Sequence, residues 1–190
     1  MDSTAIIDAL LREIPGDPSW FEAVDSRDGM ATVYVPAEHL VETCRALRDS
    51  PALRFVLLAD ITAVDFLPRT PRFEVIYLLA CPGTSGFGTT PRRLRLKVRV
   101  PGDARIPTVS TVWPAANWPE RELYDLFGIV VDGHPDLRRI LMPDDWEGHP
   151  MLRDYPVQIK TPVKTYEPLQ LSEEEFVANL ETARSGSKRE

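Results

Sequence analysis

The sequence contains no long apolar segment. No stretch of its 190 residues approaches the roughly 18 to 20 apolar residues that a helix needs to cross a bilayer. The first residues also lack a basic stretch followed by a hydrophobic one, so we expect no secretory signal. Any attachment to a membrane would therefore go through partner proteins.

The sequence is also poor in cysteine and histidine, the side chains that most often bind metal ions. Cys44 and Cys81 stand alone, without the CxxC spacing typical of iron–sulfur clusters and structural zinc. His134 and His149 are each followed by proline and lie fifteen residues apart, which is neither helical nor hairpin spacing. We therefore expect no metal or other cofactor in this chain.

Basic residues are outnumbered by acidic ones, and several common catalytic motifs are missing. The 22 Lys and Arg face 29 Asp and Glu, and the net charge of −7 argues against a nucleic-acid binder, which must neutralise phosphates. No GxSxG, P-loop or GxGxxG motif is present. Glu120 and Glu122 could suggest paired-carboxylate catalysis, but residues two apart on a helix face different ways. We expect no complete active site in this chain.

The first fifty residues predict two helices with a hairpin between them. Apolar residues at helical spacing precede Pro15–Gly16, which ends the first helix. Residues 20–25 and 30–35 form the predicted hairpin. Pro36 opens the second helix, with Cys44 on its inward face as a small core residue.

The middle of the sequence predicts strands. Residues 54–64 and 73–80 are rich in Val, Ile, Leu and Phe, as expected in the middle of a sheet. Asp60 and Asp65 would then be turn residues at strand ends. Residues 81–91 are rich in Gly, Ser, Thr and Pro, a composition typical of a mobile loop.

A basic strand follows. Between Arg93 and Val100 apolar residues alternate with Arg and Lys, which predicts a half-buried antiparallel strand with one basic face. Two interpretations stay open. In one, the strand lies at an edge of the sheet, where its charges prevent edge-to-edge aggregation. In the other, the basic face docks an acidic partner.

Together with a short helix at 108–112, these patterns predict an α+β fold with a mixed, mainly antiparallel sheet and helices packed on it. We expect a single domain over 1–156 and an extended C-terminal arm over 157–190. The arm is polar and punctuated by prolines, so it cannot bury a core of its own.

The arm should contain one short helix and a disordered end. Ser172 and Glu175 have the spacing of a capping box, and the helix would run to about Arg184. Its narrow apolar strip consists of Phe176, Val177 and Leu180. Because a lone helix of this length is marginal in water, we expect it to pack on its own domain or clasp another subunit.

The most distinctive segment is 118–156, which reads WPERELYDLFGIVVDGHPDLRRILMPDDWEGHPMLRDYP. Asn117 and Glu120 have the spacing of a second capping box, at the start of a helix. Pro119 suits its first turn and Gly128 suits its C-terminal cap. The segment therefore predicts a short helix with two defined ends.

This helix carries more charge than a core accepts, and two interpretations of Glu120, Arg121, Glu122 and Asp125 stay open. In the first they form a solvated face, with ion pairs worth about 0 to 1 kcal/mol each. In the second Arg121 forks between a carboxylate of its own chain and one of a partner, because guanidinium geometry suits bidentate pairing. Composition alone favours the first interpretation.

The same segment resembles the C subunit of the proton-pumping NADH:quinone oxidoreductases (respiratory complex I) and of related membrane-bound quinone reductases and hydrogenases. The Glu-Arg-Glu helix, the run Gly-His-Pro-Asp-Leu-Arg-Arg and the final Asp-Tyr-Pro carry the match, which is strongest over 106–156. In that family the C subunit resembles a cofactor-free structural piece of the hydrophilic arm. The resemblance favours the second interpretation of the helix charges.

The resemblance implies a non-catalytic subunit that supports electron transfer from NADH through iron–sulfur clusters to quinone, coupled to proton translocation. Other subunits would bind the NADH, flavin, iron–sulfur clusters and quinone. The implied partners are the D subunit and the iron–sulfur subunits beside the quinone site, at the cytoplasmic face of the cell membrane. The alternative is the equivalent subunit of a related membrane-bound hydrogenase or formate-linked complex.

The resemblance also suggests which residues face those partners. The candidates are Glu120, Arg121, Glu122, Asp125, His134, Arg138, Arg139, His149, Arg153, Asp154 and Tyr155. At one position the sequence departs from the family, because Leu152 stands where an Arg is usual. Arg153 is then the only cation of that turn, which weakens the case for an ionic contact there.

Overall fold

The computed structural model describes residues 2–14, 17–83, 91–156 and 172–186. The chain divides into two compact units, Met1–Tyr155 and Pro156–Glu190. Most of the predicted mobile loop, the predicted extended run of the arm and its predicted disordered end lie outside the described residues. The domain boundaries drawn from the sequence stay a prediction.

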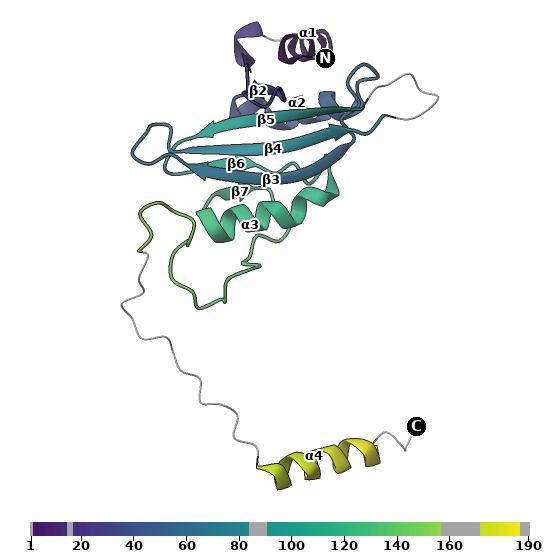
Figure 1. Cartoon of the computed structure of the whole chain (residues 1–190), viewed down its shortest axis with the longest axis vertical. Helices are drawn as coiled ribbons and strands as arrows, with labels where there is room; N and C mark the ends of the chain where they lie inside the picture. The colour runs from purple at the N-terminus through teal and green to yellow at the C-terminus, as the bar shows by residue number, and fades with distance from the viewer. Residues whose placement is uncertain (1, 15–16, 84–90, 157–171, 187–190) are drawn as a thin grey trace. The chain divides into compact units, whose positions relative to one another are not determined.

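A five-stranded sheet forms the centre of the first unit (Figure 1). Its order is β1-β2-β5-β4-β3, with β2 and β5 parallel and every other neighbouring pair antiparallel. The strands are β1 (Glu22–Val24), β2 (Ala31–Tyr34), β3 (Leu57–Asp65), β4 (Phe73–Cys81) and β5 (Arg92–Val100). The predicted α+β class with a mixed, mainly antiparallel sheet is confirmed.

The position of one strand rejects one of the two interpretations of the basic strand, and another strand lies elsewhere in the sheet than predicted. β5 lies between β2 and β4, so the interpretation of its basic residues as edge protection is wrong. β3 lies at an edge rather than in the middle. Its register shifts between Leu58 and Asp60, and the Asp60 carboxylate accepts the N–H of Ile61 at 2.8 Å. An irregularity and a charge are usual protections for an edge strand.

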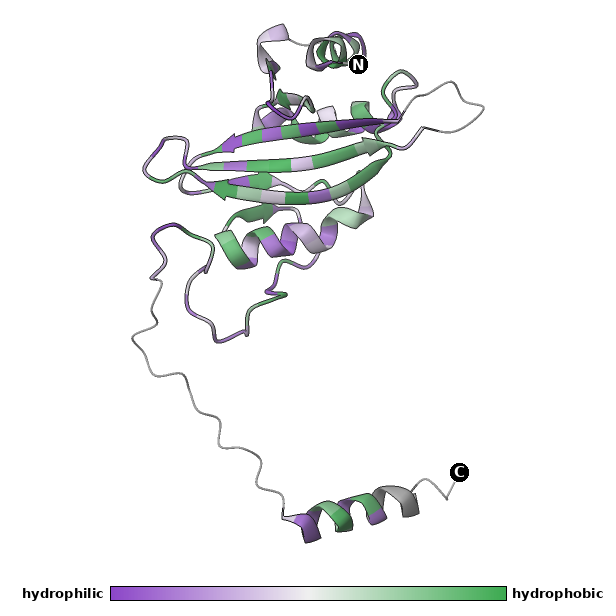
Figure 2. Cartoon of the chain, in the orientation of Figure 1, coloured by the Kyte–Doolittle hydropathy of each residue, from purple (hydrophilic) through white to green (hydrophobic). Residues whose placement is uncertain are grey.

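Carboxylates of the same chain neutralise the basic face of β5. The ion pairs are Arg95–Asp28 at 2.6 Å, Lys97–Glu74 at 2.8 Å and Arg99–Glu22 at 2.7 Å. The apolar residues that alternate with these cations are buried in the core, and Figure 2 shows this alternation along β5. The paired cations leave little positive charge on this face for an acidic partner.

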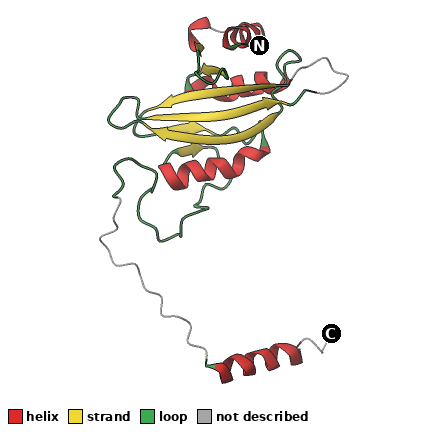
Figure 3. Ribbon diagram, viewed as in Figure 1, coloured by secondary structure: helices red, strands yellow, loops and turns green. Residues whose placement is uncertain are grey.

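The N-terminal half supplies helices to the core (Figure 3). These elements are α1 (Ser3–Glu13), η1 (Pro18–Trp20), η2 (Ala37–His39) and α2 (Leu40–Asp49). The Asp2 carboxylate accepts the N–H of Ala5 at 2.8 Å and caps α1. The predicted helices and hairpin are confirmed, and Cys44 is fully buried on α2 as a core residue.

The second half of the first unit adds a helix and a small parallel sheet. Its elements are β6 (Arg105–Pro107), η3 (Pro114–Ala116), α3 (Asn117–Phe127) and β7 (Val130–Asp132), with β6 and β7 paired. The helix predicted at 108–112 is wrong. The N–H groups of Val112 and Trp113 both donate to the Val109 carbonyl at 2.9 Å, which makes a turn instead.

The second unit contains α4 (Glu173–Gly186). The N–H of Glu175 donates to the Ser172 hydroxyl at 3.2 Å, and the N–H of Ser172 donates to the Glu175 carboxylate at 3.1 Å. The predicted capping box is therefore confirmed. Neither α4 nor any other described helix is long and apolar enough to cross a membrane.

Candidate functional site

Helix α3 begins and ends where the sequence predicts, but only the cap at its C-terminal end matches the prediction. Gly128 adopts a φ of 72°, and its N–H bonds to the carbonyls of Leu123 and Tyr124, as predicted for a C-terminal cap. At the other end no side chain caps the helix. The capping box predicted for Asn117 and Glu120 is wrong, because the Glu120 side chain turns into the core.

The Glu120 carboxylate is completely buried. It accepts hydrogen bonds from the Thr108 hydroxyl and the Val109 N–H, both at 2.6 Å. Burial raises the pKa of Glu120 above its usual range, while these two donors and the neighbouring His134 act in the opposite direction. The interpretation of a solvated face is wrong for this residue.

His134 lies beside this carboxylate. Its Nδ1 accepts the N–H of Asp136 at 3.0 Å, so the ring proton must sit on Nε2. Nε2 donates to the Asn117 carbonyl at 3.0 Å and lies 3.8 Å from the Glu120 carboxylate. His134 thereby fixes the loop after β7 to the first turn of α3.

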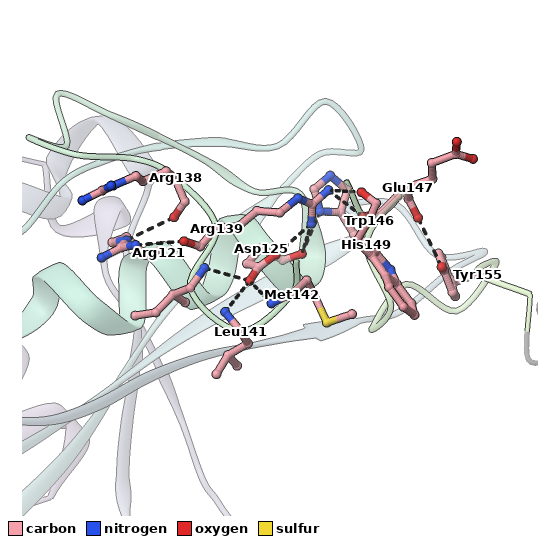
Figure 4. Close-up of polar contacts among 12 residues, drawn as sticks. Arg121, Asp125, Arg138, Arg139, Leu141, Met142, Trp146, Glu147, His149 and Tyr155 are labelled. Carbon is pink, nitrogen blue, oxygen red and sulfur yellow. Dashed lines mark hydrogen bonds and ion pairs between the residues drawn. The ribbon is translucent and has the colours of Figure 1, made fainter. Parts of the chain in front are cut away.

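Residues 138–155 contain no helix or strand, and we call this segment, which is fastened to α3, the strap. Asp125 of α3 is fully buried and holds the first part of the strap. Its carboxylate accepts three consecutive backbone N–H groups, those of Ile140 at 3.0 Å, Leu141 at 2.7 Å and Met142 at 2.8 Å (Figure 4).

Charge adds to these bonds, because Arg139 donates to the Asp125 carboxylate at 2.7 Å. Burial alone would raise the pKa of Asp125, but the three backbone donors and Arg139 together lower it to about 2. Asp125 therefore stays ionised at neutral pH and cannot belong to a solvated face. Its negative charge is compensated by Arg139 and by backbone N–H groups of its own chain.

Two arginines bind backbone carbonyls of the strap (Figure 4). Arg139 donates to the carbonyls of Trp146 at 2.9 Å and Gly148 at 3.1 Å, which folds the strap back on itself. Arg121 donates to the carbonyls of Arg138 at 3.1 Å and Arg139 at 2.8 Å. The structure corrects the prediction for Arg121, since its fork grips two carbonyl oxygens of the strap and not a carboxylate of its own chain.

The later part of the strap closes over the C-terminal end of α3. His149 Nδ1 lies 2.9 Å from the Asp125 carbonyl, and the N–H of Met151 donates to the Leu126 carbonyl at 3.0 Å. The His149 ring lies so close to Gly128 that a Cβ there would sit 2.7 Å from a ring carbon. Gly128 is thus required both for its backbone conformation and for this approach.

The end of the strap is fastened to the sheet. Asp65, the last residue of β3, accepts the N–H of Arg153 at 2.9 Å and pairs with Arg72 at 2.7 Å. Arg72 also pairs with Asp154 at 2.6 Å. Burial would raise the pKa of Asp65, but Arg72 and the N–H groups of Arg153 and Leu67 lower it to about 2. Asp65 is more than the predicted turn residue, because it anchors the strap.

Leu152 fits this arrangement without a charge. Its side chain is partly buried against the hydrophobic core. The neighbouring Arg153 guanidinium donates to the Leu67 carbonyl at 3.1 Å, and the Tyr155 hydroxyl donates to the Glu147 carbonyl at 3.2 Å. Leu152 therefore contributes apolar packing to the strap.

The partner-interface candidates differ in exposure. The side chains of Glu120, Asp125 and His134 have no exposed surface. The prediction that these three residues face a partner is therefore corrected, because their contacts lie inside the chain. By contrast, 73% of the Arg138 side chain and 52% of the Asp154 side chain are exposed. The prediction that the exposed candidates meet partners stays a prediction.

Three large apolar side chains are exposed on α3 and the strap. Trp118 is 69% exposed, Leu141 60% and Met151 54%. Reasoning from charges missed them. For Leu141 and Met151 the sequence carried a usable signal, since they are apolar residues in a segment with little helix or strand pattern. Within the described ranges no group of three or more His, Cys, Asp or Glu could hold a metal ion.

The raised pKa of Glu120 gives a test. Unfolding returns this pKa to about 4.3, so stability should fall as pH rises above that value, because the folded state disfavours the charge. Glu120→Gln keeps the shape, and its amide can bond both Val109 and Thr108. We expect this variant to gain stability relative to the native chain as the pH rises above about 4.3, measured by urea unfolding.

The matched control for this measurement is Glu122→Gln, on the exposed face of the same helix. Because this side chain is exposed, the variant should change the pH dependence of stability much less than Glu120→Gln does. If the stability difference between Glu120→Gln and the native chain does not change with pH, the pKa of the buried Glu120 is not raised in the folded chain.

Several known proteins are similar to this chain in sequence. The family model described as "Respiratory-chain NADH dehydrogenase, 30 Kd subunit" matches residues 33–161. The C subunit of the NADH-quinone oxidoreductase of Saccharopolyspora erythraea is 46% identical over 149 residues, which cover 77% of this chain and 56% of that protein. The C subunit of the Geobacter sulfurreducens enzyme is 51% identical over 133 residues, covering 68% of this chain and 76% of that protein.

Two solved structures are similar in fold. The trypsin-resistant fragment of Nqo5 is 38% identical with a TM-score of 0.55, covering 70% of this chain and 99% of the fragment. A chain of the archaeal membrane-bound sulfane sulfur reductase is 26% identical with a TM-score of 0.65, covering 89% of this chain and 98% of that one.

Proposed function

The chain belongs to the family of the 30 kDa subunit of respiratory-chain NADH dehydrogenases, and from this premise we propose that it is a structural subunit of an NADH:quinone oxidoreductase. In this role it supports electron transfer from NADH through iron–sulfur clusters to quinone, coupled to proton translocation. The NADH, flavin, iron–sulfur and quinone sites belong to other subunits. The chain is peripheral, at the cytoplasmic face of the membrane.

The strap is the observation that supports this role best. A segment without helix or strand would normally lose conformational entropy when it docks, at a cost of about 1 to 2 kcal/mol per residue. Here Asp125 and Asp65 fix the strap within the chain, through four backbone N–H groups of the strap and the two arginines Arg139 and Arg72. A surface ordered in advance binds a partner without that cost.

The chemistry of this surface suits a protein partner. Trp118, Leu141 and Met151 are large, exposed and apolar, and Trp is among the residues that contribute most to interfaces. The strap also carries two exposed charged groups, the Arg138 guanidinium and the Asp154 carboxylate. We propose that the D subunit and the iron–sulfur subunits beside the quinone site dock here, so that this chain holds them in register.

Copurification tests this proposal. We expect the combined variant Trp118→Ser, Leu141→Ser and Met151→Ser to lose the D subunit and the iron–sulfur subunits during purification, because it removes the apolar anchors. The melting temperature of the chain alone should not change, because these side chains are exposed. The subunits that remain are identified by mass spectrometry.

The control carries Val56→Ser and Leu57→Ser, which alter apolar residues of similar exposure at the start of β3. It should retain the partners. Normal assembly of the combined variant would show that α3 and the strap are not the docking surface.

The same mass spectrometry distinguishes the quinone reductase from the alternative, a hydrogenase complex. Nickel-site subunits in place of flavin and NADH-binding subunits would indicate a hydrogenase. The relatives from Saccharopolyspora and Geobacter, both named for NADH-quinone oxidoreductase, do not favour that alternative.

A further inference from the structure

The turn between β3 and β4, residues 66–72, meets the end of the strap at the buried carboxylate of Asp65. This carboxylate accepts the N–H of Leu67 from the turn and the N–H of Arg153 from the strap, both at 2.9 Å. Two segments that are far apart in the sequence are thereby fixed next to each other.

The meeting point holds two exposed arginines against adjacent residues of the turn. The Arg153 guanidinium donates to the Leu67 carbonyl at 3.1 Å. The guanidinium carbon of Arg69 lies 5.7 Å from the centre of the Phe66 ring, and the N–H of Arg69 donates to the Phe66 carbonyl at 2.9 Å. Both cations are therefore restrained within the chain. Arg153 is the only cation of its own turn, and the fold adds Arg69 from the other segment.

The carboxylates nearest to these arginines in the fold are already used. Asp65 and Asp154 both pair with Arg72, at 2.7 Å and 2.6 Å. Within the described ranges neither Arg69 nor Arg153 forms an ion pair with a carboxylate, whereas the cations of β5 are neutralised by their own chain. The two guanidinium groups therefore remain available for carboxylates of another molecule.

We propose that Arg69 and Arg153 together bind an acidic patch on another subunit of the complex, in addition to the apolar anchors described above. This inference rests on the proposed function. A guanidinium can donate two parallel N–H bonds to one carboxylate, and a restrained one loses less freedom when it does so. Anionic membranes fit less well, because they are bound by clusters of about four to eight cations, and the net charge of this chain is −7.

Binding of the full chain to the complex prepared without this subunit tests the inference. Arg69→Glu with Arg153→Glu reverses both charges. The matched control is Arg45→Glu with Arg93→Glu, which makes the same change in net charge at exposed arginines of α2 and β5. We expect the first variant to bind roughly tenfold more weakly at low salt and the control to bind as the native chain does. The loss should shrink at high salt, which screens the charges.

Arg69→Glu alone separates docking from folding. The Arg69 guanidinium forms no hydrogen bond within the described residues, so this variant should keep the melting temperature of the native chain and still bind more weakly. Native affinity in both this variant and the double variant would overturn the inference. So would binding of the native chain to phosphatidylglycerol vesicles that the double variant loses, because the ligand would then be a lipid surface.

Carbodiimide crosslinking identifies the partner. Arg69→Lys and Arg153→Lys keep the positive charge and introduce amines, which carbodiimide joins to carboxylates in direct contact. In the assembled complex these amines should crosslink to Asp or Glu of another subunit, which mass spectrometry identifies. Crosslinks confined to carboxylates of this chain would contradict the inference.

The two proposals fail in different ways. If the native chain copurifies with no subunit of a quinone reductase, the proposed function is wrong and the inference falls with it. If the native chain assembles and both charge-reversal variants bind with native affinity, the inference alone is wrong.

Discussion

Asp125→Ala is expected to release the strap and to destabilise the protein by about 3 to 5 kcal/mol. The change removes one buried carboxylate and leaves three backbone N–H groups and the Arg139 guanidinium without it. Each orphaned donor carries its own desolvation cost. Denaturant unfolding measures the loss, and limited proteolysis should cut the variant within residues 138–155 while the sheet resists.

Two comparisons isolate the cause of this loss. Asp132→Ala removes a carboxylate of the exposed Arg105–Asp132 pair and should cost only about 0 to 1 kcal/mol. Asp125→Asn keeps one oxygen for the N–H groups but turns an amide donor toward Arg139, so its loss should be intermediate. If Asp125→Ala costs no more than Asp132→Ala, the carboxylate does not hold the strap.

The loss of stability at acid pH should depend on the same carboxylate, that of Asp125. The pKa of Asp125 is about 2 in the folded chain and near 3.9 in the unfolded one, so its stabilisation is present above about pH 3.9 and lost as pH falls toward 2. Asp125→Asn should therefore make stability less steep in this window. Asp65 has a pKa of about 2 as well and leaves part of the slope in place.

Gly128→Ala should destabilise the chain by about 2 to 4 kcal/mol, more than Gly29→Ala. The two glycines have nearly the same backbone conformation, with φ of 72° and 69°. A methyl group at Gly29 meets nothing within 4 Å, so that change costs only the left-handed conformation, about 1 to 2 kcal/mol. At Gly128 the methyl would lie 2.7 Å from the His149 ring.

The difference between the two variants therefore measures the contact with His149. Displacing that ring also breaks its bond to the Asp125 carbonyl, so strap and helix should loosen together. Thermal unfolding of both variants under one condition gives the comparison. Equal losses at the two positions would mean that His149 moves aside without cost and that the strap does not need this close approach.

Local signals explain what the sequence could predict. A turn between alternating runs predicts the hairpin of β1 and β2, and Pro36 predicts the start of the helix that follows. Gly128 and the pair Ser172 and Glu175 are likewise recognisable because a cap involves only neighbouring residues. Such signals need no knowledge of the rest of the fold.

Long-range contacts explain what the sequence could not predict. Helical spacing shows which residues share a face of α3, but it does not show that distant backbone N–H groups cover Glu120 and Asp125. A charged residue with such partners looks the same in sequence as a solvated one. Alternation along β5 is equally ambiguous, because it does not depend on which strands pair on either side.

Amide hydrogen exchange of the full chain without partners tests most directly whether the docking surface exists before assembly. The amides of Ile140, Leu141 and Met142 should exchange as slowly as those of β4, because Asp125 holds them inside the chain. In Asp125→Ala they should exchange quickly while β4 stays protected. If the three amides exchange as in an unfolded peptide in the native free chain, and slow down only in the complex, the partner builds the strap and the account is wrong.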